Sequence, residues 1–139
     1  MKLITKENNN YVLRLDEDEE LIQTLIAFCK KSRIKSGFFS GLGAAKETVI
    51  SEYSLAKKRY SDKTIKSEME IAGLIGNIAK MDKKIIIHAH AILSNFNKGV
   101  TGGHVKKLVV GATCEIFLKA INKTIKREFS PEIGLNLMK

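Results

Sequence analysis

The sequence predicts an α+β fold, with a largely antiparallel, curved sheet and one main amphipathic helix. Short apolar segments bounded by turn residues recur along most of the chain and are typical of strands, and one segment near the N-terminus has helical periodicity. No helical segment separates the later strands, which disfavours a doubly wound sheet. With 139 residues the chain is long enough for one hydrophobic core, so we expect residues 1–139 to form a single domain.

The helix is expected directly after a short strand at residues 11–15, where apolar and polar side chains alternate. Asp16 is the predicted N-cap, because Glu19 follows three residues later and acidic side chains fill the next turn. Lys30, Lys31 and Arg33 close the helix, where cations complement its macrodipole. The apolar stripe expected to pack against the sheet consists of Leu21, Ile22, Leu25, Ile26 and Cys29.

The remaining elements are strands separated by polar turns. Residues 34–42 and 48–56 are expected to be two strands joined through Gly41-Leu42-Gly43-Ala44 by a turn or bulge. A strand rather than a helix follows these glycines, so they do not form a dinucleotide fingerprint. Residues 57–66 predict an exposed basic hairpin end, and residues 95–99 predict a turn. Further strands are expected at residues 69–78, 84–93, 108–119 and 124–129.

The chain is basic: 24 lysine and arginine residues against 15 acidic ones give a formal net charge of +9 at pH 7. Such a balance attracts polyanions, including nucleic acid. Only four of these cations are arginine, which favours phosphate contacts over recognition of base edges. A lysine-rich chain is equally typical of a protein encoded by an AT-rich genome.

No apolar run reaches the roughly 18 residues that a membrane helix needs, and residues 1–10 lack the apolar core of a secretory signal. We therefore expect a cytoplasmic protein with no membrane partner. Cys29 and Cys114 are isolated, one in the expected helix and the other in an apolar strand. They are expected to be buried thiols rather than a disulfide.

All three histidines lie in two short motifs, His88-Ala89-His90 and Gly102-Gly103-His104. Side chains two residues apart on a strand share a face, so His88 and His90 project together. The two glycines allow a returning loop to bring His104 close to this pair. Three converging imidazoles are typical of a Zn²⁺ site, where bound water can reach a pKa of about 7. The alternative is a hydrogen-bonded histidine network that fastens the loop after Phe96 to the sheet.

Taken together, the motifs of the chain resemble the plants and prokaryotes conserved domain, or PPC domain, over nearly the whole length. The motifs that carry the resemblance are Tyr11-Val-Leu-Arg-Leu, Gly41-Leu-Gly-Ala, Glu70-Ile-Ala-Gly-Leu-Ile-Gly76-Asn, His88-Ala-His90, Gly102-Gly-His104 and Thr113-Cys-Glu115-Ile. The resemblance implies an α/β fold and a homotrimer, as in bacterial and archaeal members. Similar proteins carry the same pair of histidine motifs, and plant members add AT-hook segments that bind DNA.

The chain lacks the Arg-Gly-Arg-Pro core of an AT-hook, so DNA binding cannot be carried over from the plant proteins. Any contact with nucleic acid would depend on cations of the folded surface and would be salt-sensitive and directed to phosphates. The candidates on the expected hairpin are Lys57, Lys58, Arg59, Lys63 and Lys66.

Two carboxylates are candidates for a role beside the histidines. Glu115 lies in an apolar segment, where it could orient an imidazole or act as a general base, and Glu70 raises the same question. We expect Glu115 to lie nearer the site, although an ion pair or an exposed strand face explains either residue equally well. Neither Ser94 nor Cys114 has the partners that a nucleophile needs. Asn77, beside a glycine, is expected in a turn, with a place facing the same cavity as the alternative.

The sequence thus favours a DNA-associated or regulatory binding module with a three-histidine metal site over an enzyme. The alternative is a metal-dependent hydrolase or lyase that acts on a small molecule through a histidine-bound water. In a third interpretation the metal only fastens the trimer.

Overall fold

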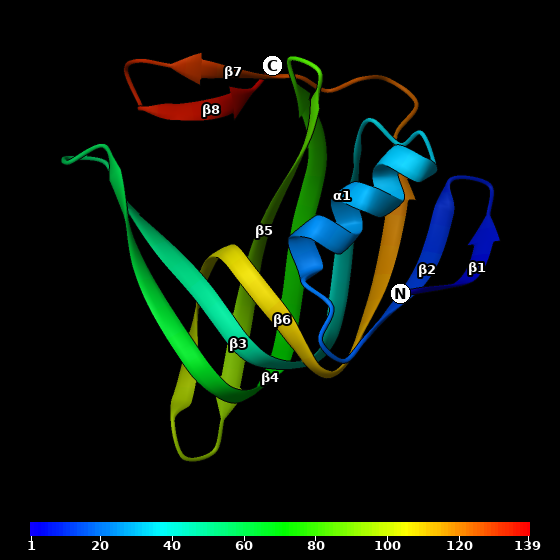
Figure 1. Ribbon diagram of the computed structural model, residues 1–139. Helices are drawn as coiled ribbons and strands as arrows, with labels where there is room; N and C mark the ends of the chain where they lie inside the picture. Colours follow the sequence, from blue (N-terminus) through cyan, green and yellow to red (C-terminus); the bar gives the residue numbers. More distant parts are fainter.

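The computed structural model describes residues 1–139 and contains eight strands and one helix (Figure 1). The elements in chain order are β1 (Lys2–Glu7), β2 (Asn10–Asp16), α1 (Leu21–Lys31), β3 (Gly37–Ser54), β4 (Arg59–Met81), β5 (Lys84–Asn95), β6 (Gly99–Ala120), β7 (Arg127–Ser130) and β8 (Leu135–Met138). Six strands form one antiparallel sheet in the order β1-β2-β6-β3-β4-β5, and β7 and β8 form a separate hairpin. The predicted architecture, a mostly antiparallel sheet with a single helix, is confirmed.

The strands β3, β4, β5 and β6 close into a ring, because β5 and β6 pair with each other in addition to their other partners. Near its start, β6 lies between two neighbours: His104 is opposite His90 of β5 and also opposite Ser51 of β3. The far end of β6 instead pairs with β2. Three strands therefore meet at the level of His104.

Strand β3 is continuous over 18 residues, whereas we predicted two strands joined by a turn. The glycines form a bulge instead, and the register of β3 against β4 shifts between Gly41 and Gly43. Gly43 has φ of 150°, and a Cβ there would lie 2.1 Å from the carbonyl oxygen of Thr113 on β6. Glycine permits this close approach, so the strand bends and continues.

The helix begins later than predicted, and Asp16 is not its cap. Asp16 is the last residue of β2. The backbone N–H of Val110 donates a hydrogen bond to the carbonyl oxygen of Glu19, and Glu20 forms a β-bridge with Val109, so the segment after Asp16 stays extended. Helix α1 therefore starts at Leu21 with Glu20 as N-cap, and no acidic side chain lies in its first turn. The Glu20 carboxylate accepts hydrogen bonds from two free backbone N–H groups of that turn.

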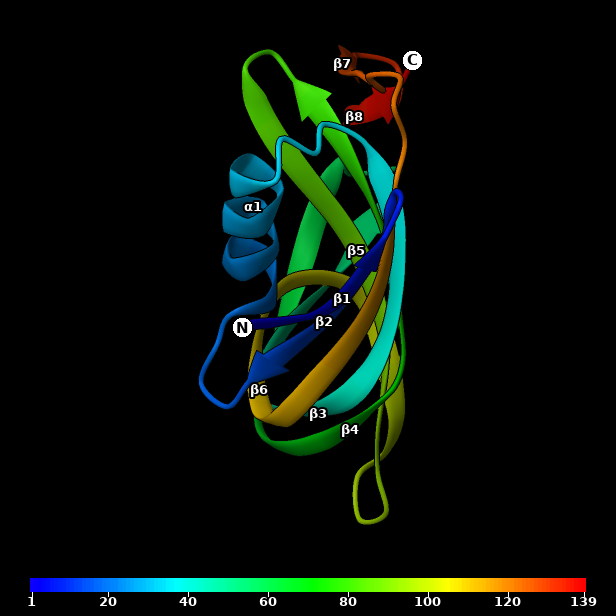
Figure 2. The same cartoon turned by 90° about the vertical axis from the view of Figure 1, so that its right-hand side faces the viewer.

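The hydrophobic core lies between α1 and the sheet face that it covers (Figure 2). The helix packs against β5 and β6. The fully buried side chains of the helix include Leu21, Leu25 and Cys29. On the sheet, Cys114 of β6 is also fully buried. Both cysteines are buried and free, as predicted.

Two segments differ from the prediction in extent. Strand β4 starts at Arg59, so most of the predicted hairpin end at residues 57–66 is strand, and the turn itself is short. Strands β1 and β8 were not predicted, and each is anchored to a single partner strand. The turn at residues 95–99 is present between β5 and β6.

No helix of the structure is both long and apolar enough to cross a membrane.

Candidate metal centre

The three histidines come from two paired strands. His88 and His90 lie on β5, and His104 lies on β6 directly opposite His90. We expected a loop to deliver His104, but Gly102 and Gly103 belong to the strand. A Cβ at Gly102 would lie 2.4 Å from the carbonyl oxygen of Ala91. The glycines therefore act by letting the backbones of β5 and β6 approach each other, not by forming a loop.

The three imidazoles lie together, as the sequence predicted. The ring centres of His88 and His90 are 5.2 Å apart, those of His88 and His104 are 5.0 Å apart, and those of His90 and His104 are 5.6 Å apart. One nitrogen from each ring lies within 4.8 Å of the other two. A tetrahedral Zn²⁺ with Zn–N bonds of about 2.0–2.1 Å would bring such nitrogens to about 3.3 Å apart. To share one ion, the nitrogens would therefore have to come closer by at most about 1.5 Å.

The lowered pKa values of two of the rings, His88 and His104, suit cation binding. Burial lowers the pKa of His88 to about 4, and the nearby His104 and Arg127 contribute in the same direction. Burial and the neighbouring His90 also hold the pKa of His104 below its usual value. Neutral imidazole is the form that binds a metal. In addition, Nδ1 of His104 is buried without a hydrogen-bond partner, so it has an unused polar atom that a bound ion or its ligands could engage.

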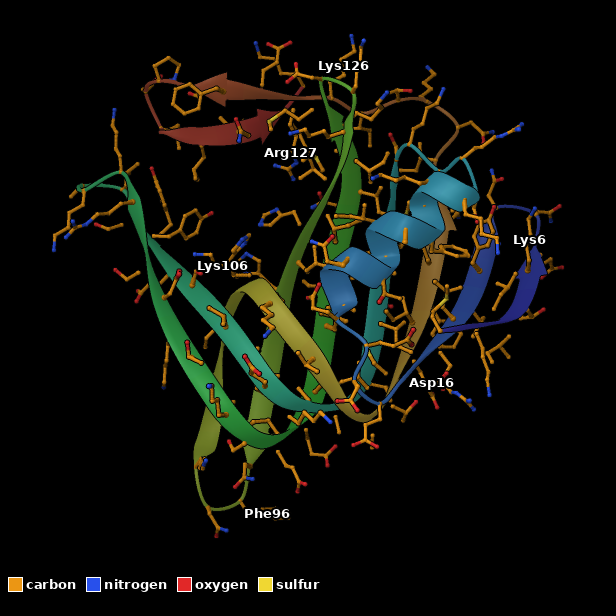
Figure 3. The ribbon with its side chains drawn as sticks, in the orientation of Figure 1. Lys6, Asp16, Phe96, Lys106, Lys126 and Arg127 are labelled. Atoms are coloured by element: carbon orange, nitrogen blue, oxygen red, sulfur yellow. The ribbon has the colours of Figure 1, made fainter.

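Arg127, the first residue of β7, contacts the cluster from the C-terminal hairpin (Figure 3). Its Nη2 donates to Oδ1 of Asn77 at 2.8 Å and lies 3.3 Å from Nδ1 of His88, and its Nη1 donates to the carbonyl oxygen of Asn136 at 2.8 Å. Its Nε is buried and has no partner. Burial also lowers the pKa of the guanidinium. A half-buried cation thus lies beside the three histidines.

The expected turn at Asn77 is wrong, because Asn77 lies in β4 opposite His88. The alternative agrees with the structure, since Asn77 lines a hollow together with His88 and His90. Its position follows from the length of β4, which continues past Gly76 to Met81. Arg127 was noted in the sequence only as one of four arginines. Its place at the start of a short strand that includes Phe129 was the one signal in the sequence. The packing of this strand against β4 is a tertiary contact, which the sequence does not indicate.

A cleft of about 770 Å³ opens onto the histidines. The residues that line it include Ser51, Tyr53, Tyr60, Asp62, His88, His90, His104 and Leu135. The ring of Tyr60 lies 5.1 Å from that of His104. Two carboxylates, Glu52 and Asp62, also line the cleft. Asp62 accepts a hydrogen bond from Ser51 at 2.7 Å and pairs with Lys106. The cleft therefore combines aromatic walls with polar groups.

The two predicted carboxylates lie elsewhere. Glu115 is exposed on β6, in the part of that strand that pairs with β2 and β3. It is opposite Arg14 of β2 and Leu42 of β3. Strands β3 and β4 separate that part of β6 from His90, and each inter-strand spacing is about 4.8 Å. Glu70 is exposed and lines a different cleft, with Ser94. The structure does not bring either residue to the histidines of the same chain.

The hairpin cations do not share one face. Lys57 and Lys58 lie in the β3–β4 turn, and Nζ of Lys58 donates to the carbonyl oxygen of Pro131 at 2.8 Å. Arg59 and Lys63 are four residues apart on β4 and point to the same face of the strand, whereas Lys66 points to the opposite face. All five side chains are exposed.

A larger group of cations gathers at the end of the molecule where α1 ends and β4 turns into β5, and we call it the basic end. It consists of Lys30, Lys31, Arg33, Lys35, Lys80, Lys83, Lys84, Lys123 and Lys126. A bridge between Lys80 and Lys126 and a hydrogen bond from Ile125 to Ser36 hold these segments together. None of these cations forms an ion pair. Sequence reasoning missed the group because three separate segments supply it.

Comparison with known proteins supports one family. The sequence matches the Plants and Prokaryotes Conserved (PCC) domain, which we call the PPC domain, over residues 4–122. The chain therefore belongs to the PPC-domain family. The match includes β2 to β6 and all three histidines. No protein with a curated description matches the sequence significantly.

Solved structures agree with this assignment. A PPC protein from Pyrococcus horikoshii is 33% identical, has a TM-score of 0.88, and matches over 95% of this chain and 92% of its own. A putative DNA-binding protein from Bacteroides thetaiotaomicron is 30% identical with a TM-score of 0.92, over 97% and 94% of the two chains. A metal-containing protein from Archaeoglobus fulgidus is 29% identical with a TM-score of 0.88, over 100% and 99%.

Proposed function

We propose that residues 1–139 form a single PPC domain that holds a divalent cation, Zn²⁺, at His88, His90 and His104 and associates with nucleic acid through phosphate contacts. The observation that carries the metal site is the convergence of three imidazoles within 4.8 Å of one another. A similar protein from Archaeoglobus fulgidus is described as metal-containing, and one from Bacteroides thetaiotaomicron as a putative DNA-binding protein.

The three histidines fit zinc by donor type as well as by number. Imidazole nitrogens suit Zn²⁺, and a three-histidine set leaves a fourth position open. Such an ion would supply Lewis acidity, while the chain's own residues shape the access to it. The cleft lined by Tyr53 and Tyr60 opens onto the three histidines that would hold the ion.

The metal proposal is tested by zinc titration of protein purified without a histidine tag. Isothermal titration calorimetry is expected to give one Zn²⁺ per chain, and His104→Ala is expected to abolish tight binding. Asn97→Ala, in the exposed β5–β6 turn, leaves all three histidines in place and serves as the control. Zinc that still binds tightly to His104→Ala would show that the ligand assignment is wrong.

Nucleic-acid contact is supported by the net charge of +9 and by cations that lack ion-pair partners. Two surfaces qualify: the hairpin cations Lys57, Lys58, Arg59, Lys63 and Lys66, and the basic end. We propose that the basic end makes the larger share of the contacts, because the hairpin cations are divided between two faces. Binding by either surface would neutralise phosphates and show little sequence preference.

Fluorescence anisotropy with a short labelled duplex separates the two surfaces. Binding is expected at low salt and should weaken at least about tenfold between 50 and 200 mM salt if several lysines contact phosphates. Replacing Lys83, Lys84 and Lys126 with glutamine should reduce affinity and the salt slope more than replacing Lys57, Lys63 and Lys66. No binding at low salt would refute the nucleic-acid proposal, and the reverse order of the variants would move the contacts to the hairpin.

We also propose that the chain assembles as a homotrimer through the sheet face opposite α1, of which the β7–β8 hairpin covers only one end (Figure 2). The apolar side chains on that face, all more than half exposed, are Phe38, Leu42, Ile75, Ile92 and Phe117. Ile75 is opposite His90, so the contact would border the metal site. Light scattering should give three chains for the wild type and fewer for Ile75→Asp, with the equally exposed Leu55→Asp as control. A monomeric wild type would contradict the trimer.

A hydrolase or lyase acting on a small molecule is the second candidate, and the cleft beside the histidines is the observation that favours it. In this function Asp62, which lines the cleft, would take the role that the sequence analysis gave to Glu115. Asp62 is held by Ser51 and Lys106, an arrangement that stabilises its charged form.

A further inference from the structure

The sheet face opposite α1 carries an exposed patch around His90, which we call the histidine half. Ala89 and Ala91 are buried in the core, so His90 between them points to the opposite face. Ile75, opposite His90 on β4, and Ile92, two positions further along β5, are 66% and 55% exposed on that face. An ion at the three histidines would therefore lie at the border of an open apolar surface.

A second patch on the same face lies on β3 and β6, and we call it the glutamate half. Cys114 and Ile116 of β6 are buried in the core. The residues that alternate with them, Glu115 and Phe117, therefore point away from α1. Leu42, opposite Glu115 on β3, is 57% exposed, and Phe117 is 60% exposed. The carboxylate of Glu115 thus lies within an apolar surface.

Glu115 forms no ion pair within its own chain. Arg14 is opposite Glu115 on β2, but its guanidinium pairs with Asp16. Lys119 lies beyond Phe117 on the same strand and also forms no ion pair. Burying an unpaired carboxylate in an apolar contact is costly. A contact between copies that covers Glu115 would therefore need to bring a cation to it.

The histidines, in turn, lack a free carboxylate of their own chain. Asp62 has both oxygens engaged, one by Ser51 and the other by Lys106. Ser51 is opposite His104, so the next residue, Glu52, points to the other face of β3. Three neutral imidazoles leave the charge of a divalent ion uncompensated and one tetrahedral position open.

We propose that the metal centre is completed between two copies of the chain, with the carboxylate of Glu115 of the partner subunit at the fourth position of the ion. The inference rests on the proposed metal site and the proposed trimer. A cyclic trimer joins two different surfaces of each chain, as the histidine half and the glutamate half are. Both halves are apolar, and the unpaired carboxylate of one complements the divalent cation of the other. Carboxylate oxygen is also a regular ligand of Zn²⁺.

The first measurement compares zinc affinities by competition with a chromophoric chelator. Glu115→Gln keeps the size of the side chain and removes its charge. It should weaken zinc binding at least about tenfold, because loss of a ligand costs no less than loss of a group that only orients one. Glu70→Gln removes another exposed carboxylate, from β4 of the histidine half, and should bind zinc like the wild type. Wild-type zinc affinity in Glu115→Gln would overturn the proposal.

Subunit mixing tests whether the carboxylate acts from a second copy. Glu115→Gln and His104→Ala are mixed at equal concentration in guanidinium chloride and refolded together, with refolded wild type as the control. In random trimers about one chain in four combines its own three histidines with an intact Glu115 of the partner subunit. Zinc should therefore bind tightly to about a quarter of the mixed chains and to neither variant refolded alone. No recovery in the mixture, while the wild type recovers, would overturn the proposal.

The outcomes separate this inference from the functions on which it rests. Tight zinc binding by His104→Ala would refute the metal site itself. A monomeric wild type in light scattering would refute the trimer, and the shared centre with it. A trimer in which His104→Ala loses zinc and Glu115→Gln keeps it would refute only the shared centre.

Discussion

Nη2 of Arg127 lies 3.3 Å from Nδ1 of His88, which joins the C-terminal hairpin to the histidine cluster. A guanidinium can only donate, so the histidine nitrogen is the acceptor in this contact. The charge of Arg127 also contributes to the lowered pKa of His88. The same residue thus influences how His88 can bind a cation.

Arg127→Gln should bind Zn²⁺ more tightly than the wild type, by several-fold. The guanidinium occupies a lone pair of His88 and repels a divalent cation at short range, and glutamine removes both effects. Competition with a chromophoric zinc chelator measures the change. Lys98→Gln, which removes one cation from the exposed β5–β6 turn, is the control. Weaker zinc binding by Arg127→Gln would contradict the electrostatic account.

Asn77→Ala should lower the free energy of unfolding by about 1–3 kcal/mol, because Arg127 loses the 2.8 Å hydrogen bond that holds it beside β4. Urea denaturation followed by circular dichroism measures this change. The same substitution at Asn97, an exposed turn residue, should have little effect. Equal effects of the two substitutions would show that the Asn77 contact contributes nothing to stability.

Gly102→Ala should destabilise the fold by roughly 1–3 kcal/mol and weaken zinc binding. The added methyl group would lie 2.4 Å from the carbonyl oxygen of Ala91, so β5 and β6 would have to separate where they carry the histidines. Gly73→Ala is the control, since its methyl group would only reach ordinary contact with Ile92 at 3.8 Å. Unchanged zinc affinity in Gly102→Ala would argue against strand proximity as the basis of the site.

Both cysteines should resist alkylation in the folded protein. Burial raises the pKa of the Cys29 and Cys114 thiols to about 12, so at pH 8 only about one in ten thousand is a thiolate. Iodoacetamide labelling followed by mass spectrometry should give no adduct in buffer and two in guanidinium chloride. Fast labelling of the folded protein would show that one of these thiols is accessible.

The sequence predicted the fold and the histidine cluster because both depend on local regularities. Alternation along β5 placed His88 and His90 on one face, and a glycine pair marked the close approach at His104. The glycine pair itself is compatible with a loop or with a strand, so the sequence could not show that Gly102 lies in β6. That distinction depends on which strand passes beside it, and β6 passes beside both β5 and β3.

The errors of the sequence analysis also have a common physical origin. Asp16 carries a typical helix-start pattern, yet pairing of residues 18–20 with β6 delays the helix until Leu21. Arg127 and the basic end are assembled from segments distant in the chain, and no periodicity reports such contacts. Glu115 illustrates the converse, because an apolar strand in the interior of a sheet can still present every second side chain to solvent on the uncovered face.

X-ray absorption at the zinc edge tests the central claim most directly, using tag-free protein loaded with one equivalent of Zn²⁺. The account predicts a first shell with three imidazole nitrogens at about 2.0–2.1 Å and no sulfur, since both cysteines are buried in the core. A spectrum with a sulfur neighbour, with fewer than three imidazoles, or matching hydrated zinc would contradict it.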